Sequence, residues 1–190
     1  RPADLGVLAG LGVSRVEVVV RPKVAVLSNG DELVLPHEPL TPGKIRDMNS
    51  YFLPALITEA GGDPLLLGIA RDAVESVREK LRLAVERGAN LVLSSAGVSV
   101  GAFDVVKTVL DEMGSVEFWK VNLRPGKPLT FGQIHGTCFL GLPGNPVSAM
   151  VTFDVFARPV IRKMLGLSVE MPTRMATMGE AMTSDGRMTF

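Results

Sequence analysis

The stretch PLLLGIARDAVESVREKLRLAVERGANLVLSS, residues 64–95, decides the fold. Residues 64–69 and 91–95 are short apolar runs of the kind found in buried strands. Between them, residues 73–87 carry an apolar stripe at helical spacing. The stripe consists of Val74, Val77, Leu81, Ala84 and Val85. A strand, a helix and a second strand in this order predict two parallel strands with the helix packed against the sheet.

The same alternation continues through most of the chain. Further strands are expected at 23–27, 116–121, 129–134 and 138–142, and further helices at 49–60, 105–113 and 145–166. In the last helix, Pro159 predicts a kink. The predicted fold class is therefore α/β, a three-layer domain with a mostly parallel sheet and helices on both faces. Ligands of such sheets bind at the carboxyl ends of the strands, so functional residues are expected in the loops that follow them.

Composition narrows the class of protein. The 190 residues include 20 basic and 20 acidic side chains, with 46% apolar residues, which excludes a disordered, collagen-like or disulfide-scaffold chain. Zero net charge argues against a nucleic-acid binder, which needs a basic excess. The single cysteine, Cys138, excludes an internal disulfide and fits a cytoplasmic setting. No apolar run reaches the roughly 18 residues of a spanning helix, so no membrane partner is expected.

The first candidate loop is SSAGVSVGAFD, residues 94–104, between a predicted strand and a predicted helix. Its small residues let a backbone approach a ligand, amides near a helix start favour phosphate, and Ser94, Ser95 and Ser99 add hydroxyl groups. No Gly-Lys-Ser/Thr closes the loop, so it is not a P-loop. A tight turn explains the pattern equally well, and Asp104 also fits a helix cap.

Acidic residues follow two further strands. Asp31 and Glu32 are adjacent carboxylates that can hold Mg²⁺, although a solvated turn is the simpler interpretation. Asp72, with Glu75 three residues later, resembles a capping box, and on sequence alone capping is preferred to catalysis. Asp47 is likewise a turn or cap candidate.

Basic residues and a second glycine-containing loop complete the set. Lys120, Arg124 and Lys127 lie around a proline-stiffened loop and can hold phosphate or an oxyanion, or form a solvated hairpin tip. The segment GLPGNPVS, residues 141–148, joins a strand to a helix, with Asn145 as a cap and Pro146 suited to the first helical position. Acids and cations after several strands imply an anionic ligand, a nucleotide or phosphorylated cofactor, with a divalent metal.

Seven segments in order resemble the MoeA/gephyrin family, the molybdopterin molybdenumtransferases. They are 28–33, 47–50, 68–72, 94–104 with Lys107, 118–121, 125–128 and 141–148. The resemblance implies a molybdopterin-binding domain at 21–166. It also implies that the chain is a fragment, with the end of an N-terminal region at 1–20 (a helix around 2–12 and a strand around 16–20). A linker and the start of a C-terminal β domain are expected at 167–190.

The resemblance also implies an activity, the Mg²⁺-dependent insertion of molybdate into adenylylated molybdopterin with release of AMP. Glu32, Asp72 and Asp104 resemble the family's catalytic and metal-handling acids. The implied substrate-binding residues are Asp31, Ser94, Ser95, Gly97, Ser99, Gly101, Lys120, Arg124, Lys127, Pro143, Gly144, Asn145, Pro146 and Ser148. The family further implies a homodimer at full length and a molybdopterin adenylyltransferase as the upstream enzyme, and it leaves open whether the chain alone turns over.

Some positions depart from the family pattern. Ala96 stands where glycine is frequent, and we expect the turn to survive if residue 96 does not need a positive φ. Ala102 replaces a frequent acid, Val105 a frequent tyrosine and Arg124 a frequent lysine. Two alternatives stay open. A molybdopterin adenylyltransferase usually carries Gly-Gly-Thr-Gly where this chain has residues 96–99. A non-catalytic scaffold module, as in gephyrin's receptor anchoring, has no need of the acidic set.

Overall fold

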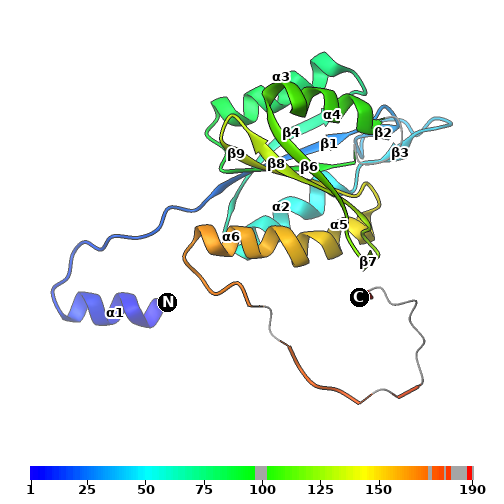
Figure 1. The fold of residues 1–190 in the computed structure, drawn as a ribbon. Helices are drawn as coiled ribbons and strands as arrows, with labels where there is room; N and C mark the ends of the chain where they lie inside the picture. The colour runs from blue at the N-terminus through cyan, green and yellow to red at the C-terminus, as the bar shows by residue number, and fades with distance from the viewer. Residues whose placement is uncertain (97–101, 171–172, 178, 181–187, 190) are drawn as a thin grey trace.

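The computed structural model describes residues 1–96, 102–170, 173–177, 179–180 and 188–189, without the side chains of 102–104, 116, 118–120 and 188–189. A six-stranded sheet with the order β4-β1-β5-β9-β8-β6 forms its centre (Figure 1). The parallel strands are β4 (Asp63–Ala70), β1 (Lys23–Asn29), β5 (Leu91–Ser95) and β9 (Thr137–Leu142). β8 (Pro128–Ile134) pairs antiparallel with β9, and β6 (Gly114–Lys120) pairs antiparallel with β8 and so runs in the same direction as the four parallel strands. The predicted mostly parallel sheet is confirmed.

Helices cover both faces of the sheet, which confirms the three-layer prediction (Figure 1). One face carries α3 (Val74–Glu86) and α4 (Ala102–Met113), and the other carries α2 (Asn49–Ala60), α5 (Pro146–Thr152) and α6 (Arg158–Met164). Side chains alternate between the faces along each strand. In β1, Ala25 and Leu27 therefore pack in the core under α3 and α4, while Val24 and Val26 pack in the core under α2 and α6.

The last helix is interrupted where a kink was predicted. Between α5 and α6, residues Phe153–Ala157 form a π-helical segment, η1. Pro159 has no N–H, and its ring crowds the carbonyl of the residue four positions earlier, Val155, which lies inside η1. A wider turn at this point accommodates the proline, so the kink takes the form of a π-helical turn.

Short elements surround the domain. The helix α1 (Pro2–Gly10) confirms the expected N-terminal helix, and it buries no residue. The strand expected around 16–20 is wrong, because these residues have no regular structure and pair with no strand among the described residues. Two small parallel pairs join β2 (Leu33–Val34) to β3 (Ile45–Arg46), and β7 (Leu123–Arg124) to β10 (Met188–Thr189).

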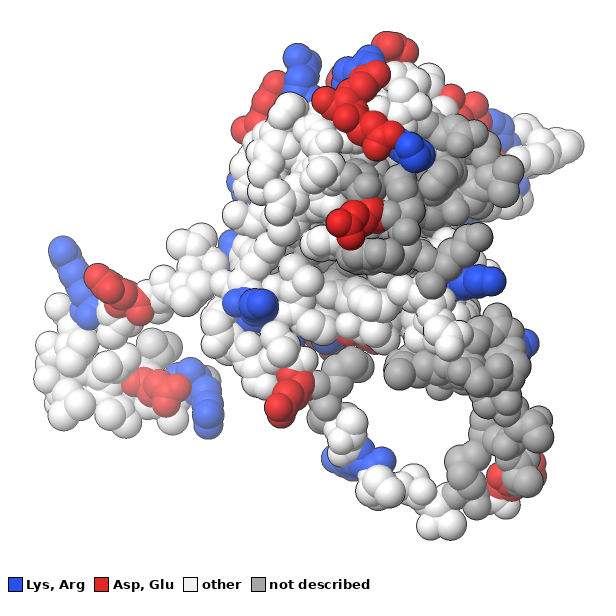
Figure 2. All heavy atoms as spheres, viewed as in Figure 1, with Lys and Arg blue, Asp and Glu red and all other residues white. Residues whose placement is uncertain are grey.

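Charges of both signs stand side by side over α3 and α4, in agreement with the neutral composition (Figure 2). Arg78 of α3 pairs with Glu75 (3.0 Å) and with Glu112 of α4 (2.6 Å). No helix in the described part of the chain has the length and apolar character needed to cross a membrane.

Candidate functional site at the carboxyl edge of the sheet

The strand register brings the predicted loops to one edge of the sheet. Ser95 pairs with Ser28 and with Leu142, and Asn29 pairs with Ala70, so the four parallel strands end together. β8 starts at the same edge because it runs antiparallel to β9. β6 ends at this edge because it runs antiparallel to β8. The chain leaves β1 toward β4 on one side and later adds β5 on the other, which is the strand-order reversal where α/β sheets bind ligands.

Asp72 lies at the centre of the acidic part of this edge. Its Oδ1 accepts a hydrogen bond from Asn29 Nδ2 (2.9 Å), and its Oδ2 accepts one from the Asp31 backbone N–H (3.3 Å). Asp31 reciprocates, since its Oδ1 accepts from the Asp72 N–H (3.3 Å). Two carboxylates from the ends of adjacent strands are thus held together through backbone amides.

The capping interpretation of Asp72 is wrong. The residue before α3 is Ala73, and no side chain caps the helix there. The Ser76 hydroxyl instead accepts from the Arg71 N–H (3.0 Å). Asp72 is drawn away from the helix because Asn29 and the Asp31 amide offer it donors from β1, contacts across 43 and 41 residues that have no local sequence signal.

Glu32 and nearby cations complete the acidic loop. A Cβ placed on Gly30 would lie 2.7 Å from Glu32 Oε1, so the Glu32 carboxyl group folds back over Gly30 at the end of β1. Lys44 Nζ donates to the Asp31 carbonyl (2.6 Å), and Arg71 Nη1 donates to the Leu33 carbonyl (3.3 Å). These cations fix the loop backbone and offset the negative charge of the exposed carboxylates.

Of the three acidic residues expected to bind a metal, the structure describes the side chains of only two. Glu32 and Asp72 lie in loops at the same edge, whereas the Asp104 side chain is outside the described part of the structure. α4 begins at Ala102, so Asp104 lies in its first turn and is not the residue before the helix, as the capping interpretation required. Among the described side chains, no group of three or more acidic, histidine or cysteine residues is placed to hold a metal ion.

The serines before the first candidate loop are buried. Ser94 and Ser95 are each 1% exposed, and the Ser94 hydroxyl donates to the Ala96 carbonyl (3.4 Å). Gly97, Ser99 and Gly101 lie outside the described residues. Direct contact of this loop with a ligand therefore stays a prediction.

Ala96 has a φ of +70°, so position 96 does need the left-handed conformation. The methyl group costs about 1–2 kcal/mol in this region of φ, and the turn forms in spite of that cost. Strained backbone of this kind is concentrated at functional sites.

The basic loop reaches the same edge from β6 and β8. Arg124 and Lys127 are exposed, and the Lys120 side chain is outside the described set. The Val121 N–H donates to the Lys127 carbonyl (2.9 Å), which closes the loop. Gly126, with a φ of +117°, is buried so closely against Thr152 that a Cβ there would lie 2.6 Å from Thr152 Cγ2. The loop thus rests on α5 and presents two cations at the edge.

The loop after β9 forms as predicted. Asn145 precedes α5, and its side chain accepts a hydrogen bond from the Ser148 N–H (3.2 Å), which confirms the cap. Pro146 occupies the start of the helix. Pro143 is buried, and a Cβ on Gly144 would lie 3.1 Å from the Ala96 Cβ, so this loop packs against the loop after β5.

Ser95 apart, the sequence did not predict the buried polar cluster that lies beneath this edge and supports it. The Ser28 hydroxyl donates to Asp47 Oδ1 (3.1 Å), and the Ser28 and Ser50 hydroxyl oxygens are 2.8 Å apart. Asn49 Nδ2 donates to Ser95 Oγ (2.6 Å) and to the Gly144 carbonyl (2.9 Å). We define Ser28, Asp47, Asn49, Ser50 and Ser95 as the switch-point cluster. Asp47 and Asn49 follow a loop and start a helix, so locally they resemble ordinary turn and cap residues.

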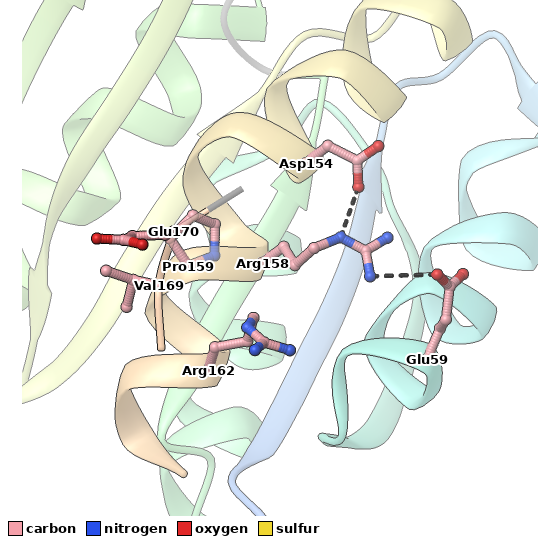
Figure 3. A pocket seen from close by; sticks show the side chains of 7 residues that line it. All are labelled: Glu59, Asp154, Arg158, Pro159, Arg162, Val169 and Glu170. Carbon is pink, nitrogen blue, oxygen red and sulfur yellow. Dashed lines mark hydrogen bonds and ion pairs between the residues drawn. The ribbon is translucent and has the colours of Figure 1, made fainter. Parts of the chain in front are cut away.

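A separate pocket of about 480 Å³ lies on the α2 and α6 side (Figure 3). Arg158 crosses it, with Nε 2.8 Å from Asp154 Oδ1 and Nη1 3.3 Å from Glu59 Oε1. Glu59 is in the last turn of α2, whereas Asn49 at the carboxyl edge is its first residue. The pocket is therefore a full helix length from the charged loops, and Arg158, one of the two arginines that line it, is already paired with two acids.

The strand order and the charged loops define a doubly wound α/β domain with its candidate site at the carboxyl edge. Residues 25–163 match the family model described as "Probable molybdopterin binding domain". The chain belongs to this family of molybdopterin-binding domains.

Comparisons with individual proteins agree with the resemblance drawn from the seven segments. The chain is 44% identical over 165 residues to the molybdopterin molybdenumtransferase of Haemophilus influenzae, covering 87% of this chain and 41% of that protein. It is 42% identical to molybdopterin molybdenumtransferase 2 of Mycobacterium tuberculosis, over 96% of this chain and 47% of the relative. A crystal structure of the molybdopterin biosynthesis MoeA protein of Pyrococcus horikoshii superposes with a TM-score of 0.75 at 36% identity, over 85% of this chain and 40% of that one. The chain thus spans less than half the length of each.

Proposed function

We propose that this chain is the molybdopterin-binding part of a molybdopterin molybdenumtransferase. The whole protein would insert molybdate into adenylylated molybdopterin and release AMP. One observation carries the proposal: the register of the sheet brings acidic loops after β1 and β4 and the basic loop between β6 and β8 to one edge. An anionic pterin phosphate needs the cations, and a divalent metal needs the acids.

In this proposal the basic residues bind the substrate and the acidic residues bind the metal. Arg124 and Lys127 would bind the phosphate oxygens of the substrate, and Lys120 extends the same basic loop. Glu32, Asp72 and Asp104 would hold Mg²⁺, because carboxylate oxygens are the ligands that this hard cation takes. When bound, Mg²⁺ neutralises charge on the phosphate and so supports cleavage of the adenylyl linkage. Asn29 and the Asp31 amide would keep the Asp72 carboxylate in place for this role.

The wider setting is part of the same proposal. The substrate would come from a molybdopterin adenylyltransferase, the protein would act in the cytoplasm, and the full-length form would be a homodimer. Support for a transferase, as against an adenylyltransferase, comes from the names and identities of the two bacterial relatives above. The acidic residues joined at the ends of β1 and β4 argue against a purely scaffolding role, which has no use for them.

The test is to incubate the chain anaerobically with adenylylated molybdopterin and Mg²⁺, with and without molybdate, and to measure the AMP released and the dissociation constant of molybdopterin. Molybdopterin binding at the edge, with molybdate-dependent AMP release, is the expected result. Failure to bind molybdopterin would contradict the proposal. Binding with AMP release that ignores molybdate would favour a different reaction on the same ligand.

A further inference from the structure

Asn49 joins three parts of the carboxyl edge that are distant in the sequence. It is the first residue of α2, and its side chain is buried, with 6% exposed. A single nitrogen, Nδ2, donates to Ser95 Oγ at the end of β5 and to the Gly144 carbonyl in the loop after β9. These partners are 46 and 95 residues away.

The position of this bond matters because the sheet ladder stops there. The pairing of β5 with β9 ends at Ser95 and Leu142. Past that point the two loops are joined by the Ala96 N–H, which donates to the Leu142 carbonyl (3.2 Å), and by the close approach of Ala96 to Gly144. Asn49 adds hydrogen bonds that reach both loops from a third element, the first residue of α2.

An amide is the group that this role requires. The NH₂ of asparagine carries two hydrogens, one for each acceptor. A carboxylate at position 49 would have none, and it would stand in the same cluster as Asp47, whose Oδ2 has no hydrogen-bond partner among the described residues. Oδ1 of Asn49 is also without such a partner, so the side chain is held by its donors alone.

We propose that Asn49 is a positioning residue for the molybdopterin site, holding the end of β5 at Ser95 and Ala96 and the loop after β9 at the separation that the ligand needs. The inference rests on the proposed function, since Ser94, Ser95 and the residues from Pro143 onward are expected to contact substrate. Asn49 itself is buried and acts through Ser95 and Gly144. Small displacements of ligand-binding groups cost much of their contribution, so loosening the two loops should weaken binding.

Ser28→Ala is the matched control. Ser28 is fully buried in the switch-point cluster and bonds to Asp47 and Ser50, but it reaches neither loop. Both Asn49→Ala and Ser28→Ala remove buried hydrogen bonds at the start of α2, so both should lower Tm. Only Asn49→Ala should loosen the contact between the end of β5 and the loop after β9.

The experiment measures two properties of the 190-residue chain and its variants. Hydrogen exchange without ligand follows the Ala96 amide, which is bonded to Leu142. Asn49→Ala should speed its exchange, relative to the β5 core amide of Leu93, by at least about tenfold. The dissociation constant of molybdopterin should rise roughly tenfold, which corresponds to about 1.4 kcal/mol. Asn49→Asp should give at least the same loss, and Ser28→Ala should stay within about twofold of the parent in both measurements.

Two results would overturn the positioning role. One is equal changes in Asn49→Ala and Ser28→Ala once matched for Tm, which would make Asn49 a merely structural residue. The other is faster exchange at Ala96 with unchanged affinity, which would show that the ligand does not depend on the loop separation. If the parent chain itself does not bind molybdopterin, the proposed function fails, and the exchange rates still decide whether Asn49 holds the loops.

Discussion

The amino and carboxyl edges of the sheet both carry turns with polar residues, but the two edges use them differently. At the amino edge, Asn90 Oδ1 accepts from the Lys23 N–H (2.8 Å), and Lys23 Nζ donates to the Arg87 carbonyl (2.7 Å). These bonds are exposed and involve the backbone. At the carboxyl edge, buried side chains bond to one another, and Asn29 Oδ1, Asp47 Oδ2 and Asn49 Oδ1 have no partner within the described residues. The polar groups of the amino edge therefore serve the backbone of its turns, whereas the carboxyl edge contains buried acceptor atoms that no described protein group satisfies, which is uncommon in a folded domain.

The largest expected difference is in the rate of AMP release between variants of two aspartates at opposite ends of β4, Asp72 and Asp63. Asp72→Asn should lower AMP release at least about 100-fold, because it removes a charged group from the proposed metal site. Asp63→Asn, at the amino end of β4, should leave the rate within about twofold. Rates are compared per folded molecule, with Tm measured alongside. Equal losses in both variants would remove the distinction between the edges.

Two lysines give the next largest contrast. Lys127→Ala should raise the dissociation constant of molybdopterin roughly tenfold, since it deletes a charge-assisted contact to phosphate. Lys23→Ala removes the bond to Arg87 at the amino edge and should lower Tm slightly without changing affinity. An unchanged constant for Lys127→Ala, measured by titration under anaerobic conditions, would take this residue out of the site.

Positive φ at two non-glycine residues allows a smaller test. Ala96 (φ +70°) lies at the carboxyl edge, and His135 (φ +46°) lies in the two-residue turn between β8 and β9 at the amino edge. Glycine at either position should raise the free energy of unfolding by about 1 kcal/mol, because it removes the strain of a Cβ. His135→Gly should not affect ligand affinity, whereas Ala96→Gly should weaken it, because glycine frees the backbone at the end of β5 beside the loop after β9.

Denaturant titration gives both stabilities. A loss of stability in Ala96→Gly would show that the packing of the Ala96 methyl group outweighs the backbone strain that glycine removes.

The smallest effect is expected on α3, away from both edges. A hydrogen bond from its own backbone N–H and the neighbouring Arg78 guanidinium lower the pKa of Glu75 below its ordinary value of 4.5. A carboxyl group with a lowered pKa stabilises the fold above 4.5, and this contribution disappears as the pH falls through the folded-state pKa. Because the pair is exposed, the Tm of Glu75→Gln should differ only slightly from the parent at pH 7.

The difference in Tm should vanish in more acidic solution. Glu86→Gln is the control for removing a charge from an exposed ion pair, because Glu86 pairs with Arg82 on the same helix. A growing difference between Glu75→Gln and the parent as the pH falls would contradict the assigned sign.

Local patterns predicted nearly all of the fold. Helix α2 and strand β5 have the predicted bounds, because apolar spacing and the flanking glycines define them. The strand expected at 16–20 does not form, since its valines find no partner strand among the described residues. α4 begins three residues before the predicted Val105, because Ala102 continues the helix as readily as the residues after it.

The hydrogen bonds at the candidate site could be predicted only where the sequence signal is local. The Asn145 cap and the Pro146 start were visible in the sequence, because each acts within one helical turn. The resemblance named Asp72, but the contacts of Asp72 and Asn49 were not visible, since their partners come from other strands and loops. The strained φ of Ala96 also depends on the neighbouring loop, whose Gly144 approaches its methyl group. Contacts between distant segments decide these roles, and spacing along the chain does not encode them.

The most direct test of the central claim is to map the amide chemical-shift changes of the labelled chain by NMR as molybdopterin is added. The account predicts that the shifts concentrate at the carboxyl edge, in residues 29–32, 70–72, 95–96, 123–127 and 142–148. Shifts concentrated around Arg158 and Arg162, or around Asn90 and His135 at the amino edge, would contradict it.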